Sequence, residues 1–162
     1  MKIIFSQSPN QEYGRREYKP EAFVIHVTEG KTYGAIAWCK DPKSAVSYHY
    51  IIDEMGDAWE LVKPENTAWH AGKIKDSTWS GLKQGINPNL YTIGIAFGGF
   101  AQNGPTLAQF ISIAELLRNI AAIHQIPLDR KYIVPHNEIR TDKICPGPHF
   151  NIDALIYLAR LK

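Results

Sequence analysis

The segment AFVIHV, residues 22–27, constrains the fold of this chain more than any other. It is a run of apolar and β-branched side chains that contains a single histidine and ends in the polar residues TEG. Such a run is typical of a buried strand. Further strand signals occur at YHYIID (48–53), AWELV (58–62), LYTIGIAFGG (90–99) and KYIVP (131–135). The short turn EMGDA between 48–53 and 58–62 predicts that these two strands form a hairpin.

Helical patterns separate these strands and close the chain. A short helix is expected over residues 33–39, before the breaker Asp41-Pro42. Thr106 and Gln109 form a capping box, and one apolar stripe follows at Leu107, Phe110, Ile111, Ala114, Leu117, Ile120 and Ala121. Asn151 is expected to cap a last helix over 152–161. The alternation predicts an α/β fold with a mixed central sheet flanked by helices, in a single domain spanning residues 1–162.

Composition excludes several classes of partner. The net charge of +2 comes without any Lys/Arg cluster, so nucleic-acid binding is not expected. No segment approaches the roughly 20 apolar residues of a membrane span. The N-terminus lacks the apolar stretch of about 7–15 residues that a signal peptide needs. We therefore expect a protein that stays in the cytoplasm until released, or that is exported by a non-classical route. We also expect it to be a monomer.

Candidate metal ligands come from six histidines and two cysteines. His26 ends the first core strand, His136 follows the strand at 131–135, and Cys145 lies nine residues further on. Strand ends in one sheet meet at a common edge, where sites tend to lie. Two imidazoles and one thiolate suffice for a catalytic zinc with a fourth position open to water. Taken singly, each residue also has an ordinary structural explanation, since a buried cysteine is usually a small hydrophobe.

Other side chains are assigned by their neighbourhood. Lys143 is placed to bring an ammonium near an oxyanion, and Tyr48 to donate a hydrogen bond to the same centre. His49 is expected in the core or behind the ligands, and His124 at a helix end, whereas His149 is left open between lining the site and packing.

The tryptophans are divided between core and loop. Trp38 and Trp59 are expected in the core. Trp69 and Trp79 lie in a polar segment, 63–89, that is long enough to predict a functional loop. For these two, stacking on a sugar or peptide competes with anchoring of the loop.

Five motifs occur in a fixed order along most of the chain. They are FVIHVTEG, SYHYIIDEMGDAWELV, NTAWHAG, YTIGIAFGG and VPHNEIRTDKICPGPHF. Together they resemble the type-2 N-acetylmuramoyl-L-alanine amidases, a family that includes phage amidase lysozymes and peptidoglycan-recognition proteins. The resemblance covers residues 22 to 150. It implies a Zn²⁺-dependent hydrolase that cuts the amide between N-acetylmuramic acid and L-alanine, with peptidoglycan or a muropeptide as substrate.

The resemblance also implies roles for single residues. His26, His136 and Cys145 look like the zinc ligands, Tyr48 like the tyrosine that assists the attacking water, and Lys143 like the lysine that stabilises the transition state. His70, in WHAG, looks like a substrate-cleft residue. Its neighbour Trp69 is expected to bind substrate because the loop 63–89 forms the wall of the cleft.

Two departures from the family pattern matter. Ala96 stands where many bacterial members have a glutamate proposed as general base, so Tyr48 or the water on the metal would carry that role. The third ligand is Cys145, where another branch has aspartate. Ala96 is also the best argument for the alternative of a non-catalytic peptidoglycan-binding module. A regulatory role through a protein partner has no specific support in the sequence.

Overall fold

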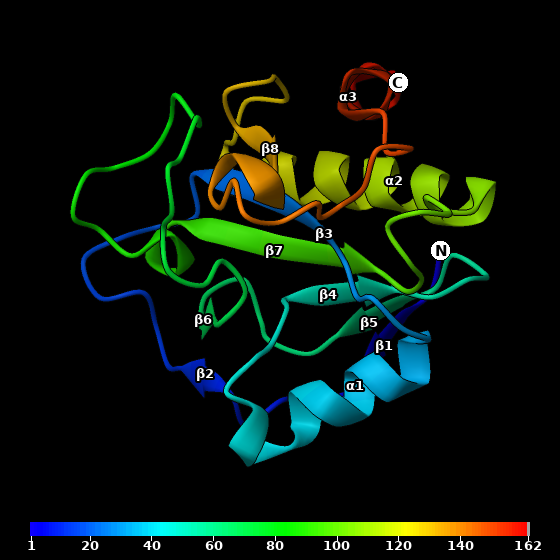
Figure 1. Ribbon diagram of the computed structural model, residues 1–162, viewed down its shortest axis with the longest axis horizontal. Coiled ribbons are helices and arrows are strands. Elements are labelled where there is room, and N and C mark those ends of the chain that lie inside the picture. Colours follow the sequence, from blue (N-terminus) through cyan, green and yellow to red (C-terminus); the bar gives the residue numbers. More distant parts are fainter. Residues whose placement is uncertain (162) are drawn as a thin grey trace.

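The computed structural model describes residues 1–161, which build a six-stranded mixed sheet with the order β1-β5-β4-β7-β3-β8 (Figure 1). The parallel strands at its centre are β3 (Ala22–Val27) and β7 (Thr92–Phe97), flanked by β8 (Ile133–Pro135) and β4 (Tyr50–Ile52). β5 (Ala58–Glu60) pairs antiparallel with β4, and β1 (Ile3–Phe5) runs parallel to β5 at the edge. The predicted hairpin and the mixed sheet are therefore confirmed.

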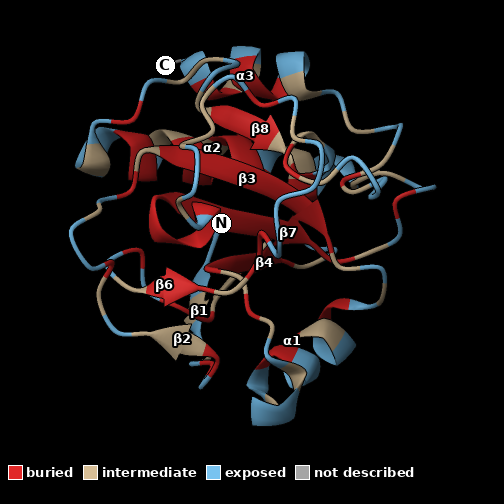
Figure 2. Cartoon of the chain, turned by 60° about the vertical axis from the view of Figure 1, so that its left-hand side comes forward, coloured by how far each residue is buried: buried red, intermediate tan, exposed pale blue. Residues whose placement is uncertain are grey.

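Helices cover both faces of this sheet. α2 (Leu107–His124) and α3 (Ile152–Arg160) lie together on one face, and α1 (Thr32–Lys40) lies on the other. A small second sheet pairs β2 (Gln11–Glu12) with β6 (Thr67–Ala68) on the side of α1. Short 3₁₀ turns complete the chain at η1 (Pro42–Ser44), η2 (Pro88–Leu90) and η3 (His136–Glu138). Figure 2 shows the buried central strands between more exposed outer layers.

The two faces of the central strands differ in chemistry because side chains alternate along a strand. On the face toward α2 and α3, the core is uniformly large and apolar, with Phe23, Ile25, Val27, Ile93, Ile95 and Phe97. The opposite face carries the intervening positions, among them His26, Thr92, Gly94 and Ala96. Small and polar residues on this second face leave space for other side chains above the sheet. The site described below occupies that space.

The helix caps form as expected, but the buried face of α2 differs from the predicted one. Thr106 Oγ1 accepts a hydrogen bond from the Gln109 backbone amide at 3.1 Å, and Oε1 of the Gln109 side chain accepts one from the Thr106 backbone amide at 2.8 Å. Asn151 Oδ1 caps α3 by accepting from the Ala154 amide at 2.9 Å. The predicted stripe is wrong at Leu107 and Ile111, which are exposed. Ile113 and Leu116 are buried in their place, because α2 contains enough apolar residues to offer two overlapping stripes.

Trp38 corrects a second expectation. Its side chain is 57% exposed and not part of the core, because α1 buries Ile36 and Cys39 instead. Trp59 is partly buried, and its Nε1 donates to Asp53 Oδ2 at 3.1 Å. β1, β2 and β6 were not anticipated from the sequence. No helix within residues 1–161 combines the length and apolar character needed to cross a bilayer.

Candidate active site

Three side chains that are distant in the sequence meet on the polar face of the sheet. His26 comes from the end of β3, His136 from the first residue of η3 after β8, and Cys145 from the loop before α3. One potential donor atom from each lies within 4.8 Å of the other two. Both histidines are buried and Cys145 is partly buried. The grouping expected from strand ends therefore forms in the folded chain.

The backbone around Cys145 holds its sulfur against the end of β3. Sγ lies 3.8 Å from Nδ1 of His26 and accepts a hydrogen bond from the Val27 amide at 3.2 Å. Two residues later, Gly147 has a φ of +111°, and a Cβ there would lie 2.2 Å from the Ala101 carbonyl oxygen. Only glycine adopts this close packing without strain. The turn that carries the sulfur is thus fixed to the segment after β7.

The electrostatics of the group suit a metal ion. Burial, reinforced by the neighbouring imidazoles, holds the pKa of His26 well below its usual range. Burial also lowers the pKa of His136, although its bond to the Ala71 carbonyl opposes the shift. Burial raises the pKa of Cys145 to about 12, against the effect of the Val27 amide. The free protein therefore presents two neutral imidazoles and a thiol, and a bound metal would displace the thiol proton.

The donor set fits zinc. Neutral imidazole nitrogen and cysteine sulfur are the ligands that Zn²⁺ prefers, and three protein ligands are typical of its catalytic sites. Among the hydrogen bonds of residues 1–161, Cys145 Sγ contacts only the backbone of Val27 and Nδ1 of His26. The sulfur therefore keeps its capacity to bind a cation.

A cleft of about 430 Å³ opens beside the group. It is lined by several of the residues that the sequence singled out, together with two cations, namely Tyr48, Trp69, His70, His136, Lys73 and Arg140. A second hollow of about 320 Å³ shares Tyr48 and continues along α1 past Trp38. Tyr48 thus lies at the border of both hollows. A substrate with two chemically different ends would fit on either side of it.

Tyr48 precedes β4 and lies against the metal group. Its ring centroid is 5.1 Å from that of His26. Burial raises the pKa of Tyr48 above its usual range, so the phenol remains protonated and acts as a hydrogen-bond donor. His49, the next residue, turns toward Arg15 and lies 2.8 Å from its guanidinium. This confirms that His49 lies behind the ligands and is not one of them.

Lys143 and Ala96 differ in how close they lie to the centre. Lys143 is exposed and does not line the cleft. Its positive charge nevertheless lowers the pKa of both His136 and Cys145, although burial and the backbone hydrogen bonds have larger effects. Ala96 is fully buried in β7, in register with His26 on β3. It packs in the apolar cluster that includes Tyr48. The position of the family glutamate therefore holds only a methyl group.

The structure separates the roles of the loop tryptophans. Trp79 is 5% exposed, stacks on Tyr91 and donates from Nε1 to the Lys131 carbonyl at 2.8 Å. It anchors the loop. Trp69 is half-buried and lines the cleft. His149 is exposed and lines neither the cleft nor the hollow along α1.

Sequence reasoning missed the polar residues that support the site. Arg15 and Asn89 are both buried on the same side of the sheet as His26. Arg15 lies in a polar N-terminal stretch and Asn89 in the long loop, where exposed side chains are the default expectation. Neither stretch carried a signal that would have marked them. The glycine inside 90–99 was the one available hint, since Gly in a strand suggests close approach of another group.

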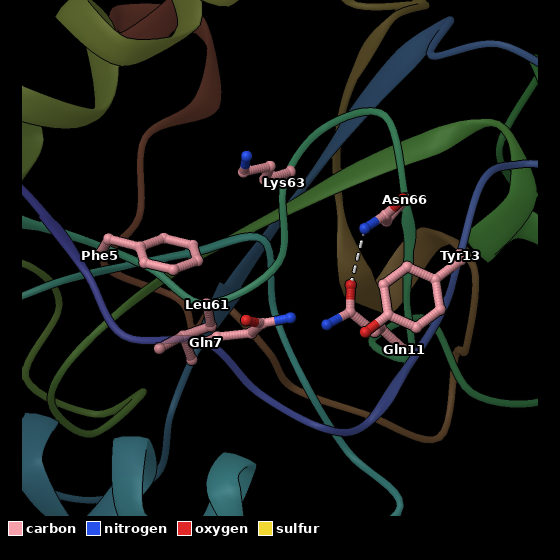
Figure 3. A pocket seen from close by; sticks show the side chains of 7 residues that line it. All are labelled: Phe5, Gln7, Gln11, Tyr13, Leu61, Lys63 and Asn66. Carbon is pink, nitrogen blue, oxygen red and sulfur yellow. Dashed lines mark hydrogen bonds between the residues drawn. The ribbon is translucent and has the colours of Figure 1, made fainter.

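A further hollow of about 320 Å³ lies away from this group, between the N-terminal segment and residues 61–66, which follow β5 (Figure 3). Its rim includes the exposed rings of Phe5 and Tyr13. Two of its amides, Gln11 and Asn66, are already paired with each other at 2.8 Å. Its lining residues include no histidine, cysteine or carboxylate.

Solved structures of other proteins share this fold. The chain superposes on a selenomethionine derivative of AmpD with a TM-score of 0.77 at 22% identity, covering 97% of this chain and 94% of that one. The N-acetylmuramoyl-L-alanine amidase LysC from Clostridium intestinale URNW gives a TM-score of 0.73 at 20% identity, covering 100% of this chain and 99% of that one. The amidase AmiD from E. coli, in complex with an anhydro-muropeptide substrate, gives 0.73 at 26% identity and covers 90% of this chain and 58% of that one.

Sequence comparison gives the family directly. No curated protein sequence matches the chain. The sequence model of the N-acetylmuramoyl-L-alanine amidases matches residues 16–148, which include all three members of the metal group and the whole cleft. With that match over most of its length, and with the fold of these enzymes, the chain belongs to the N-acetylmuramoyl-L-alanine amidase family.

Proposed function

We propose that this protein uses Zn²⁺, held by His26, His136 and Cys145, to hydrolyse the amide between N-acetylmuramic acid and L-alanine in peptidoglycan. The observation that carries the proposal is the convergence of two imidazoles and one sulfur within 4.8 Å, beside an open cleft. When bound, Zn²⁺ lowers the pKa of water to about 7 and polarises a carbonyl. Membership of the amidase family supports the choice of substrate.

The chain's own groups then act on the substrate. The protonated phenol of Tyr48, whose ring lies beside His26, donates a hydrogen bond to the carbonyl oxygen, on which negative charge develops. The ammonium of Lys143 adds a positive charge from the loop before Cys145, outside the cleft lining. The two hollows that share Tyr48 hold the glycan and the stem peptide. Trp69 contacts the substrate from the wall formed by the loop.

Digestion of purified cell walls tests this function. Mass spectrometry of the soluble fraction should find free stem peptides with an L-alanine N-terminus, and glycan left without peptides. Chelation should stop the release and added zinc should restore it. Ala96 is the observation that favours a non-catalytic binding module instead. Retention of the protein on walls without any release of peptide would establish that alternative.

Replacement of Trp69 by alanine should raise KM more than it lowers kcat. Trp69 lines the cleft and is not a member of the metal group. Its loss should therefore remove binding that is equal in the ground state and the transition state. An aromatic contact contributes about 0.5–1.5 kcal/mol beyond area, which corresponds to roughly a 2- to 12-fold rise in KM. Tyr157→Ala, on the exposed side of α3, is the matched control and should change neither constant. A fall in kcat at constant KM would place Trp69 in the catalytic machinery.

A further inference from the structure

We propose that the dipeptide His70–Ala71 is the positioning element of the metal centre, in which the His70 ring orients His26 and the Ala71 carbonyl orients His136. This inference rests on the proposed zinc function and assigns His70 a role behind the ligands, which differs from contact with substrate. The two acceptors come from consecutive residues of one loop. A single element therefore sets which ring nitrogen each histidine offers to the metal.

The first arm is a chain of hydrogen bonds whose direction is set at its far end. The Thr92 hydroxyl donates to the Pro88 carbonyl at 2.7 Å, so its oxygen accepts from Nε2 of His70 at 3.3 Å. Because the neutral His70 ring carries its proton on Nε2, its Nδ1 is an acceptor. That Nδ1 lies 3.1 Å from Nε2 of His26, which must donate. Nδ1 of His26, the atom nearest Cys145, is left with its lone pair free.

The second arm reaches the other histidine through the backbone. Nε2 of His136 lies 3.0 Å from the Ala71 carbonyl oxygen, which can only accept. The proton of this ring is therefore on Nε2, and Nδ1 is free to bind a metal. Metal-binding histidines almost always donate their other N–H in this way, and the partner fixes both tautomer and ring orientation.

The dipeptide is itself held rigidly. Oδ1 of Asn89 accepts from the His70 amide at 3.2 Å and from the Ala71 amide at 2.8 Å. Asn89 is 6% exposed and sits in η2, directly before β7. One buried amide oxygen thus fixes the acceptors for both imidazoles at once.

The His70 ring also packs directly on the sheet. A Cβ built on Gly94 of β7 would lie 2.4 Å from Cγ of His70, so the ring occupies the space that any other residue would fill. The ring is 6% exposed and contacts His26 edge-on, with centroids 5.2 Å apart. Gly94 therefore determines the place of the His70 ring and of its Nδ1 acceptor.

A neutral acceptor has a consequence for the metal. Many metal-binding histidines donate to a carboxylate, which adds negative charge behind the ligand and raises its basicity. Here both partners, an imidazole and a peptide carbonyl, are uncharged. With the Cys145 thiolate as the only anionic ligand, a bound Zn²⁺ would retain a net charge near +1. It would then polarise a carbonyl despite the strongly donating sulfur.

Two substitutions of His70 test the role of its ring nitrogen. Asparagine can place an amide oxygen close to the position of Nδ1, whereas leucine fills similar space without an acceptor. His70→Leu should weaken zinc binding about 10- to 100-fold, the range for loss of an outer partner, and His70→Asn should recover most of the affinity. Zinc affinity is measured by competition with a chromophoric chelator, with thermal unfolding as the check on folding. Affinity in His70→Leu equal to the wild type, or no recovery in His70→Asn, would overturn the inference.

A second pair of variants displaces the ring without removing any polar group. Gly94→Ala should push His70 off β7 and weaken zinc binding in the same direction as His70→Leu. Gly34→Ala on α1 is the matched control, because a Cβ there meets nothing within 4 Å, and it should bind zinc as the wild type does. Unchanged affinity in a folded Gly94→Ala protein would contradict the inference. If Gly94→Ala fails to fold, the His70 pair decides.

The outcomes separate the two proposals. A wild-type protein that binds no zinc overturns the proposed function itself. A wild-type protein that binds zinc tightly and releases stem peptides, with His70→Leu altering only KM, upholds the function and returns His70 to the substrate cleft. A loss of zinc affinity in His70→Leu and Gly94→Ala, with recovery in His70→Asn, supports both.

Discussion

Replacement of Cys145 by alanine should abolish both zinc binding and the release of stem peptides from cell walls. The sulfur is the only anionic donor in the metal group, and two neutral imidazoles remain without it. The loss should exceed the roughly 10- to 100-fold effect of removing an outer partner. Metal content of the purified variant and peptide release from walls are the two measurements. A zinc-free variant that still released peptides would show that the metal does not carry the reaction.

The other cysteine provides the matched control. Cys39 is a second free thiol, 1% exposed, packed in α1 against Ile36, Ile51 and Ala96. Burial raises the pKa of Cys39 to about 12, as it does for Cys145. Cys39→Ala therefore removes a sulfur with a similarly raised pKa from outside the metal group. It should keep one zinc per chain, and loss of zinc in this variant would mean that the effect at Cys145 is not specific.

Replacement of Arg15 by methionine should destabilise the fold by about 4 kcal/mol or more, because it leaves four buried carbonyl acceptors without a donor, at roughly 1–3 kcal/mol each. Arg15 is 4% exposed, and its guanidinium donates to the carbonyls of Pro64, Asn89, Leu90 and Thr92. Burial lowers the pKa of Arg15 to about 10 although Glu65 opposes the shift, so the side chain stays charged at neutral pH. Urea unfolding of the metal-free protein measures the loss.

Two neighbouring variants make this result specific. Arg16 is exposed and pairs only with Glu12 on the surface, so Arg16→Met should leave the urea midpoint unchanged. Arg15→Lys should not restore stability, because an ammonium lacks the planar fork that reaches several carbonyls together. Arg15→Met with wild-type stability would show that the segment from Asn89 to Thr92 is held by other contacts.

The parts of the fold that the sequence predicts are those where burial imposes a period. Residues 92–97 alternate between small or polar and large apolar side chains, and they form a strand with those two faces. Local chemistry is equally readable at Thr106, whose capping box begins α2. β1 has no such signature, because Ile3 and Phe5 are both exposed at the sheet edge. A strand with few buried side chains has no clear alternation of apolar and polar residues in its sequence.

The site follows the same division. His26, His136 and Cys145 could be proposed because two of them end strands, and the order of motifs along the chain supported the choice. The positions of Arg15 and Asn89 could not, since their roles depend on which loop carbonyls and amides the fold brings within reach. His70 was expected to face substrate. It does line the cleft, but its Nδ1 lies 3.1 Å from Nε2 of His26. The loop sequence has no periodicity from which this orientation could be predicted.

X-ray absorption at the zinc edge, on protein purified without added metal, tests the central claim most directly. One zinc per chain is expected, with one sulfur neighbour near 2.3 Å and two imidazole nitrogens at about 2.0–2.1 Å. These distances would show that His26, His136 and Cys145 close around a single ion. A zinc spectrum without a sulfur neighbour, or protein without zinc that is fully active on cell walls, would contradict the account.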